Sequence, residues 1–367
     1  MGVRLHEVST QLEIWVLIGG VVIRCHLYLG ISNIAIVRTN QNMMEHSLLL
    51  SWGDEMIISA SRRTDIPTYY SEWFMNRVRA GYVYVRNPMN IHQVSKISLS
   101  PEFVDGIVFW TKNPLPMMDK LDALSEYTYY FQFTLNSYGR DVETGIPNKS
   151  KVIIPAFQHL SDKLGPDRVI WRYDPIFLSE TYTMEYHLYY FEKLAKILSP
   201  YTKKCTISFI DFYRNTEKNI IDLSLCDFQV NKQKMIAKEI AQIAQSYGLQ
   251  VDTCAEQVDL DEYGIGHARC IDDRLFSKLL NCPLRVKKDK AQRLECGCIE
   301  SIDIGAYNTC RNGCRYCYAN FSQALVSKNG EKHDPMSPLL IGDVGPEDQI
   351  IERKMVSYKV DQIQLDF

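Results

Sequence analysis

The sequence predicts an α/β protein, a TIM-like barrel that is partial or permuted and ends in a C-terminal cysteine-rich segment. Short runs rich in β-branched and aromatic residues alternate with segments of helical spacing, which is typical of buried parallel strands and their crossover helices. Polar residues follow these runs, as they do at the mouth of a barrel. Eight of the eleven cysteines lie in the last third of the chain. A doubly wound sheet is the alternative for the same alternation.

Seven apolar runs before residue 256 are predicted as strands, and an eighth leads into three closely spaced cysteines. The expected strands are residues 56–59, 82–85, 106–110, 129–133, 168–171, 205–210, 249–252 and 301–306. The expected helices are residues 69–80, 116–124, 152–164, 184–198 and 230–247. Gly248 stops the last helix, since glycine readily takes the left-handed backbone of a helix C-terminus. The cysteine loop follows the last of these strands.

The chain is expected to divide into an extension, a barrel, a cysteine-rich segment and a tail. The extension is residues 1–55 and the barrel is residues 56–295. The cysteine-rich segment, residues 296–345, completes the barrel, and the tail is residues 346–367. The first range holds two apolar halves separated by Arg24 and His26, and neither half is long enough to span a bilayer by itself. We therefore expect no membrane association. We also expect residues 1–55 to lie outside the natural domain, with an upstream start codon chosen in error as one hypothesis.

Composition places the chain among ordinary folded proteins. Hydrophobic residues make up 46% of the chain, charged residues 23%, and the net charge is -3. This charge does not favour a general nucleic-acid binder, although a local basic patch is compatible with it. Clustered cysteines in a long, cytoplasmic chain indicate metal ligands rather than a disulfide framework, which is typical of short secreted chains.

The most informative motif is the C-x3-C-x2-C spacing of Cys310, Cys314 and Cys317, the cysteine triplet. Three thiolates on one short loop can hold three irons of a [4Fe-4S] cluster and leave the fourth iron open to a substrate or cofactor. The alternatives are a zinc knuckle and a structural cluster. Structural zinc usually takes four protein ligands, so Cys296 or Cys298 would have to supply the fourth.

A second group of cysteines precedes the triplet. Its members are Cys254, Cys270, Cys296 and Cys298, with Cys282 as a spare. Four thiolates are enough for an auxiliary [4Fe-4S] cluster. Zinc stays open as the alternative metal, and free buried cysteines are the account without any metal.

The loop around the triplet, residues 303–319 (DIGAYNTCRNGCRYCYA), resembles the cluster loop of spore photoproduct lyase-like radical S-adenosylmethionine (SAM) proteins. Residues 64–70 (TDIPTYY) and 106–115 (GIVFWTKNPL) are similar to the second and third strands of that group. Both stretches precede the triplet here, which implies circular permutation. Residues 56–342 resemble the DUF1848 family, whose hallmarks here include SRRTD at 61–65, WTKNP at 110–114, RYDP at 172–175, TCAE at 253–256 and CGC at 296–298.

The resemblance implies that the triplet holds an open [4Fe-4S] cluster and that SAM is the cofactor. It implies that Lys112 reaches the SAM carboxylate, where the alternative is a surface lysine. Tyr316 and Tyr318 would lie against the adenine, or simply pack. Asp65 and Gln132 lie at predicted strand ends and are also assigned to cofactor binding. Asp65 could bind the ribose hydroxyls or the substrate. The alternative for Asp65 is a place in a solvated loop.

These observations predict a cytoplasmic radical SAM enzyme that removes a hydrogen atom from an unknown substrate. Its partners would be a reductant such as ferredoxin or flavodoxin, and a peptide, small-molecule or nucleic-acid substrate. A non-catalytic zinc or iron-sulfur binding module is the alternative from another class. A barrel hydrolase with a structural metal is a weaker alternative, because no paired carboxylates or nucleophile-base motif is present.

Overall fold

The computed structural model describes the backbone of residues 11–18, 21–29 and 35–39, and the whole of residues 56–212, 216, 219–355 and 357–360. The chain divides into two units, Met1–Gly53 and Asp54–Phe367. The first unit contains an antiparallel sheet in the order β1 (Gln11–Ile18), β2 (Val21–Leu29) and β3 (Ala35–Thr39). Whether residues 1–55 belong to the natural domain stays a prediction.

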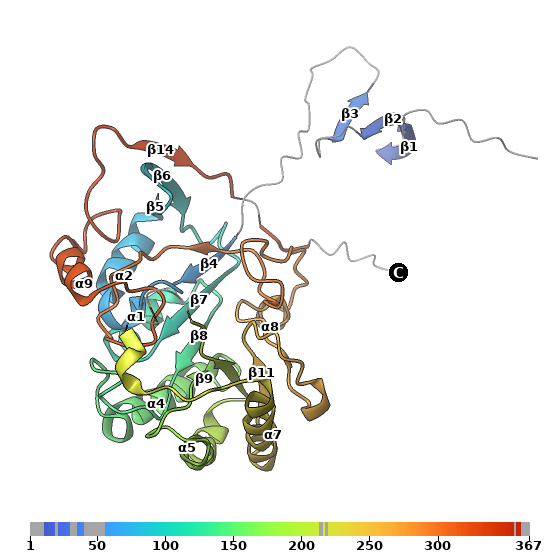
Figure 1. Ribbon diagram of the computed structural model, residues 1–367. Coiled ribbons are helices and arrows are strands. Elements are labelled where there is room, and N and C mark those ends of the chain that lie inside the picture. The colour runs from blue at the N-terminus through green and yellow to red at the C-terminus, as the bar shows by residue number, and fades with distance from the viewer. Residues whose placement is uncertain are drawn as a thin grey trace, which may run out of the picture. The chain divides into compact units, whose positions relative to one another are not determined.

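The second unit is built on an eight-stranded parallel sheet (Figure 1). In spatial order its strands are β12 (Gly266–His267), β11 (Gln250–Thr253), β10 (Lys204–Phe209), β9 (Val169–Ile176), β8 (Tyr129–Thr134), β7 (Gly106–Thr111), β4 (Ile57–Ala60) and β13 (Ile302–Asp303). Strands β4 to β12 follow chain order across the sheet. The parallel α/β sheet is therefore confirmed. No pairing among the described strands joins the edges β12 and β13, so closure into a barrel stays a prediction.

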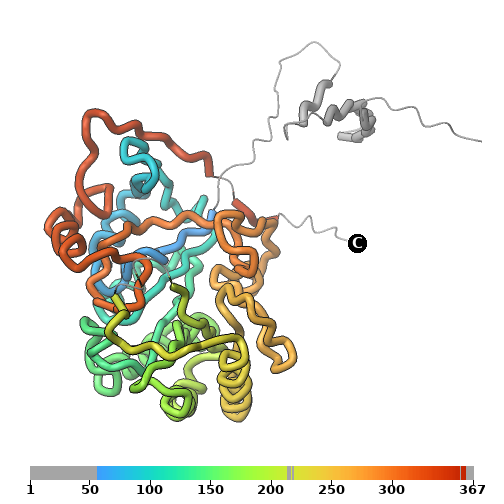
Figure 2. Tube along the Cα trace, in the orientation of Figure 1, coloured from blue at the N-terminus to red at the C-terminus, as the bar shows by residue number. Residues whose placement is uncertain are grey.

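Strand β13 breaks the chain order, because it is the last of these eight strands in sequence but pairs with β4, the first. Ile302 lies opposite Ile58 and Asp303 opposite Ser59, in parallel register. In Figure 2 the orange segment that carries β13 accordingly runs beside the blue strand that begins this unit. The carboxylate of Asp303 fixes this pairing, since it accepts hydrogen bonds from the Ser59 and Ser61 hydroxyls at 3.0 and 2.6 Å. The loop after β13 therefore starts at the same edge of the sheet as the loop after β4.

The expected strand at residues 82–85 does not belong to the parallel sheet, and that prediction was wrong. It forms β5 (Tyr82–Asn87), which pairs antiparallel with β6 (Asn90–Ser98), while β14 (Gln349–Glu352) runs parallel to β6 on its other side. Of the six β5 side chains, only Val83 is fully buried, so this sheet lies at the surface. The polar residues after residue 85 end β5 and lead into a hairpin turn at residues 88 and 89. The two-residue strand β12 takes the eighth place in the main sheet.

Four of the five expected helices match the structure closely. They are α2 (Ser71–Ala80), α4 (Ile154–Leu164), α5 (Met184–Leu198) and α7 (Val230–Ser246). The expected helix at 116–124 is divided into α3 (Leu115–Met118) and a 3₁₀ turn, Leu121–Leu124. The shorter helices are α1 (Ile66–Tyr69), α8 (Asp273–Leu280) and α9 (Gln323–Gly330). Helix α2 ends where Gly81 takes a φ of 75°, a left-handed conformation that favours glycine.

Aromatic side chains fill the core between the sheet and its helices. Phe109 of β7 and Phe131 of β8 are stacked with ring centroids 4.9 Å apart. Trp171 of β9 stacks on Phe191 of α5 at the same distance. All four side chains are fully buried. Fully burying one such ring contributes roughly 1.5–3 kcal/mol, so these layers give the strand ends a rigid support.

The burial of His187 in α5 predicts that the stability of the protein depends on pH. Its Nε2 contacts the Phe177 carbonyl at 2.8 Å and its Nδ1 contacts the Tyr173 hydroxyl at 2.9 Å. Burial lowers the pKa of His187 from 6.5 to about 4. Between those values the unfolded chain binds the extra proton, so stability falls as the pH falls from 6.5 to 4, by about 3 kcal/mol in total.

Urea unfolding of wild type and His187→Asn between pH 4 and pH 7 measures how the free energy of unfolding changes with pH. The variant is expected to lose the part of this change that His187 contributes. The same substitution at His159, an exposed histidine of α4, should leave it unchanged. A wild-type stability that stays constant over this range would contradict the assignment.

Candidate functional site

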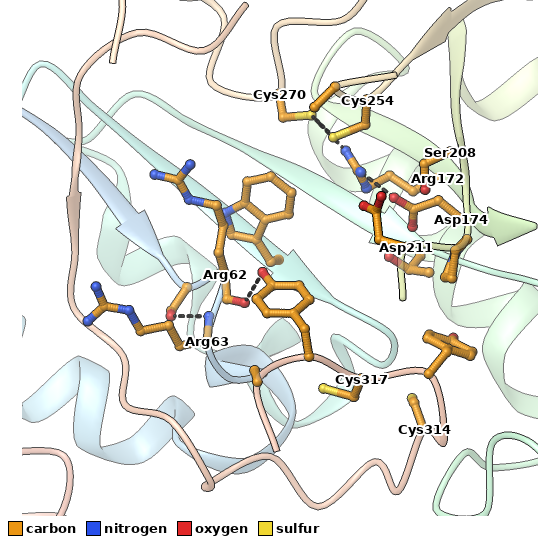
Figure 3. Close-up of a pocket in the computed structure, with 18 of the residues that line it drawn as sticks. Arg62, Arg63, Arg172, Asp174, Ser208, Asp211, Cys254, Cys270, Cys314 and Cys317 are labelled. Carbon is orange, nitrogen blue, oxygen red and sulfur yellow. Dashed lines mark hydrogen bonds and ion pairs between the residues drawn. The ribbon is translucent and has the colours of Figure 1, made fainter. Parts of the chain in front are cut away.

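The ends of six parallel strands surround one cavity of about 440 Å³. Its wall comes from residues at or just after the ends of β4, β7, β8, β9, β10 and β11, and from the loop after β13. Figure 3 shows Cys254 and Cys270 on one side of this cavity and Cys314 and Cys317 on the other. The cavity therefore brings together two groups of thiols that lie far apart in the sequence.

The cysteine triplet lies on the loop after β13, and all three members line the cavity. Burial raises the pKa of each thiol, for Cys314 to about 12. Metal binding at this loop must therefore release protons, and it would be favoured as the pH rises.

The backbone of the triplet loop is built for a close turn. Gly313 has a φ of 64°, and a Cβ there would lie 2.0 Å from the Thr144 hydroxyl. The Gly145 amide donates to the Asn312 carbonyl at 2.9 Å, which holds the loop against the segment after β8. Only glycine meets both demands at position 313 without strain.

The donor set of the triplet fits an iron-sulfur cluster with one open iron. Among the described residues, no three or more His, Cys, Asp or Glu side chains already enclose a site for a single metal ion. In a cluster each thiolate binds a different iron, so the thiolates stand apart rather than around one point. The triplet places three thiols of one loop in the cavity lining, where they could serve as such ligands.

Asp65 ties the triplet loop to the sheet. Its carboxylate accepts hydrogen bonds from the Thr111 hydroxyl and the Lys112 amide, both at 2.8 Å, and from the Asn312 side chain at 3.0 Å. It also accepts from the Thr68 amide at 3.0 Å and caps α1. Burial raises the pKa of Asp65, and these hydrogen bonds oppose that rise. Four protein donors thus engage the carboxylate that we assigned to cofactor binding.

Replacing Asp65 by alanine is expected to lower the free energy of unfolding by at least about 2 kcal/mol, because it leaves buried donors unpaired and removes a helix cap. Iron incorporation should fall as well, since Asn312 loses its anchor. Urea unfolding and iron analysis measure the two effects. Asp162→Ala, at an exposed position of α4, is the control. An unchanged urea midpoint for Asp65→Ala would contradict the anchoring role.

Lys112 lies in a buried charge network behind Cys314. Its ammonium group donates to a Glu143 oxygen and to the Tyr316 hydroxyl, both at 2.8 Å. Lys149 pairs with the other Glu143 oxygen. Burial alone would raise the pKa of Glu143, but the two ammonium groups lower it to about 2. Two cations and one carboxylate leave a positive charge beside Cys314, which suits an anionic ligand there.

Tyr316 and Tyr318 occupy different environments. The Tyr316 hydroxyl is hydrogen-bonded to Glu143, Lys112 and Asn136, and its ring lies 5.8 Å from that of Tyr138. Tyr318 donates its hydroxyl to the Arg62 carbonyl at 2.9 Å, yet 46% of the residue is exposed. Both line the cavity, and Tyr318 is the more exposed of the two.

The second group of cysteines lines the opposite side of the cavity, with Cys282 outside its lining. Gln132 is buried behind this group rather than in the lining, and its side-chain amide donates to the Cys270 carbonyl at 2.8 Å. Its assignment to cofactor binding stays a prediction, and in this structure it supports the loop that carries Cys270.

Sequence reasoning missed Glu143, Lys149 and Asp303. Glu143 lies in a coil segment with no motif, and its partners are 31 residues before it, six after it and 173 after it. Asp303 was part of the quoted loop, but nothing in its neighbours indicates that it joins β13 to β4. A carboxylate that ends a strand directly before a cysteine loop is the one signal that was available.

Comparison with protein families finds one described as "Domain of unknown function (DUF1848)", whose model matches residues 57–319. The match runs from β4 through Ala319 and includes both groups of cysteines. No curated protein matches the chain. In the described part of the chain, no helix combines the length and the hydropathy needed to cross a bilayer.

Proposed function

The chain belongs to the DUF1848 family, and we propose that it is a radical SAM enzyme whose [4Fe-4S] cluster is held by the cysteine triplet. The observation that carries this proposal is the position of the triplet. The loop follows the last strand of the parallel sheet in sequence, yet that strand, β13, pairs with β4, so the thiols line the cavity that the earlier strand ends surround. A permuted connection thus supports a site at the carboxyl edge of a parallel sheet, where α/β enzymes build their active sites.

The triplet would hold the cluster, and the cluster with SAM would supply a 5′-deoxyadenosyl radical, given one electron from a reductant such as ferredoxin or flavodoxin. This chemistry would remove a hydrogen atom from the substrate. The role of the protein is to position these partners and to keep water away from the radical.

The chain's own residues suit these tasks. The triplet provides three ligands and leaves one iron position for SAM. The network of Lys112, Lys149 and Glu143 places positive charge behind Cys314, where it offsets the charge of the thiolates. Tyr318 lines the cavity and is more exposed than Tyr316, which supports it over Tyr316 as the surface for an adenine.

The proposal is tested by anaerobic reconstitution of the full chain with iron and sulfide, followed by reduction in the presence of SAM. We expect methionine and 5′-deoxyadenosine to form in equal amounts. A non-catalytic zinc or iron-sulfur module is the competing account. Stoichiometric zinc, no iron-sulfur absorption and no 5′-deoxyadenosine after reconstitution would favour that account and contradict ours.

A further inference from the structure

We infer that four thiols on the far wall of the cavity form a second metal centre, closed by four protein ligands. They are Cys254, Cys270, Cys296 and Cys298, the thiol quartet. Figure 3 shows Cys254 and Cys270 across the cavity from Cys314 and Cys317. This inference rests on the quartet's own geometry and does not depend on the function proposed for the triplet.

Backbone hydrogen bonds hold together the three segments that carry the quartet. The Ala268 amide donates to the Thr253 carbonyl at 2.7 Å, which joins the end of β11 to the segment before Cys270. The Ile299 amide donates to the Ile271 carbonyl at 3.2 Å, which joins that segment to the Cys-Gly-Cys turn. The quartet is thus assembled by main-chain contacts rather than by one local loop.

Gly297 allows this assembly. A Cβ at position 297 would lie 2.9 Å from the Ala268 carbonyl oxygen, closer than real Cβ contacts come to a backbone atom. Any other residue would push the Cys-Gly-Cys turn away from the segment that carries Cys270. The glycine between Cys296 and Cys298 therefore serves the approach of two thiol-bearing segments.

The thiols of the quartet lie next to one another in the cavity wall. The Sγ atoms of Cys254 and Cys270 are 3.4 Å apart. Cys298 lies near both Cys270 and Cys296, and its Sγ accepts from the Ile271 amide at 3.4 Å. Four neighbouring thiols in one wall form a donor set for a soft or borderline metal.

Two guanidinium groups lie beside the quartet. The Arg172 guanidinium donates to the Cys270 sulfur at 2.9 Å and pairs with Asp174. Arg62 lies near Cys298 and pairs with Asp289 at 3.6 Å. A metal with four thiolates carries excess negative charge, and donors such as the Arg172 guanidinium can hydrogen-bond to its sulfur atoms.

Four thiolates are the ligand set of both a closed [4Fe-4S] cluster and a tetrahedral zinc ion. Among the described residues the four thiols do not already enclose a single point, so either group requires their side chains to reorient on binding. Either would leave no position for SAM, so this centre would serve electron transfer or structure rather than SAM binding. Metal analysis separates the two forms, because only the cluster contains inorganic sulfide.

The test uses the full chain with Cys310, Cys314 and Cys317 all replaced by alanine, reconstituted anaerobically with iron, sulfide and zinc. We expect this variant to keep either about four irons and four sulfides, or about one zinc, per chain. Adding Cys254→Ala and Cys298→Ala should remove that metal, whereas adding Cys282→Ala should not.

A triple variant that is folded by circular dichroism but binds no metal would overturn the inference. If the triple variant does not fold, the comparison is made in the wild-type background. There, Cys254→Ala with Cys298→Ala should lower the metal content by one centre, whereas Cys282→Ala should not. An unchanged metal content in that double variant would equally overturn the inference.

Discussion

Replacing Cys314 by alanine is expected to abolish reductive cleavage of SAM. Loss of an outer partner of a metal ligand typically costs roughly 10–100-fold in affinity or activity, so loss of the ligand itself should lower 5′-deoxyadenosine formation at least about a hundredfold. The remaining two thiolates of the triplet cannot hold three irons. Anaerobic assay with SAM and reductant, with 5′-deoxyadenosine measured chromatographically, gives the result.

The matched control is Cys282→Ala, since Cys282 lies outside the cavity lining and contacts the Pro283 and Val360 carbonyls. It should retain wild-type cleavage and wild-type iron. Equal loss in both variants would mean that cysteine substitution damages the fold in general. Cleavage by Cys314→Ala at the wild-type rate would show that the triplet does not hold the reactive cluster.

Replacing Glu143 by alanine is expected to lower the free energy of unfolding by about 3–5 kcal/mol, the usual cost of removing one partner from a buried ion pair. The reason is that Lys112 and Lys149 would both lose their buried counter-ion. The carboxylate stabilises the fold above pH 4.5 and loses this effect as the pH falls toward 2. The variant should therefore lose part of the wild type's acid sensitivity.

Urea unfolding between pH 3 and pH 7 measures both effects, and Glu102→Ala, at an exposed position, is the control. Glu143→Gln separates charge from hydrogen bonding, because the amide can still accept from one lysine. We expect the free energy of unfolding of Glu143→Gln to lie between those of Glu143→Ala and wild type. A Glu143→Ala protein as stable as wild type would show that water or a rearranged partner satisfies the two lysines.

Periodicity predicted the parallel sheet well, because strands buried on both faces read as continuous apolar runs. The same rule failed at residues 82–85. Tyr82 to Val85 are apolar and aromatic, but the segment turns back through a hairpin, and its residues are mostly half-buried. Apolar content alone does not separate a central strand from a surface strand. The strand Gly266–His267 was missed because two residues carry no period.

The two groups of cysteines could be proposed from spacing, since thiol clusters in a long chain are uncommon without a metal. Their supporting residues could not. Glu143 pairs with Lys112, and Arg172 donates to Cys270 across 98 residues of chain. Such partners are chosen by the fold, and a single sequence carries no local trace of them. Gly297 stands in the CGC motif at residues 296–298, but its close approach to Ala268 depends on a tertiary contact.

The central claim, that the cysteine triplet holds a cluster with an iron open to SAM, is tested most directly by electron paramagnetic resonance of the reduced, reconstituted protein. To isolate the triplet, Cys254 and Cys298 are replaced by alanine. We predict that adding SAM changes the g-values of the remaining cluster signal, because SAM binds its open iron. A cluster signal that is the same with and without saturating SAM would contradict the claim.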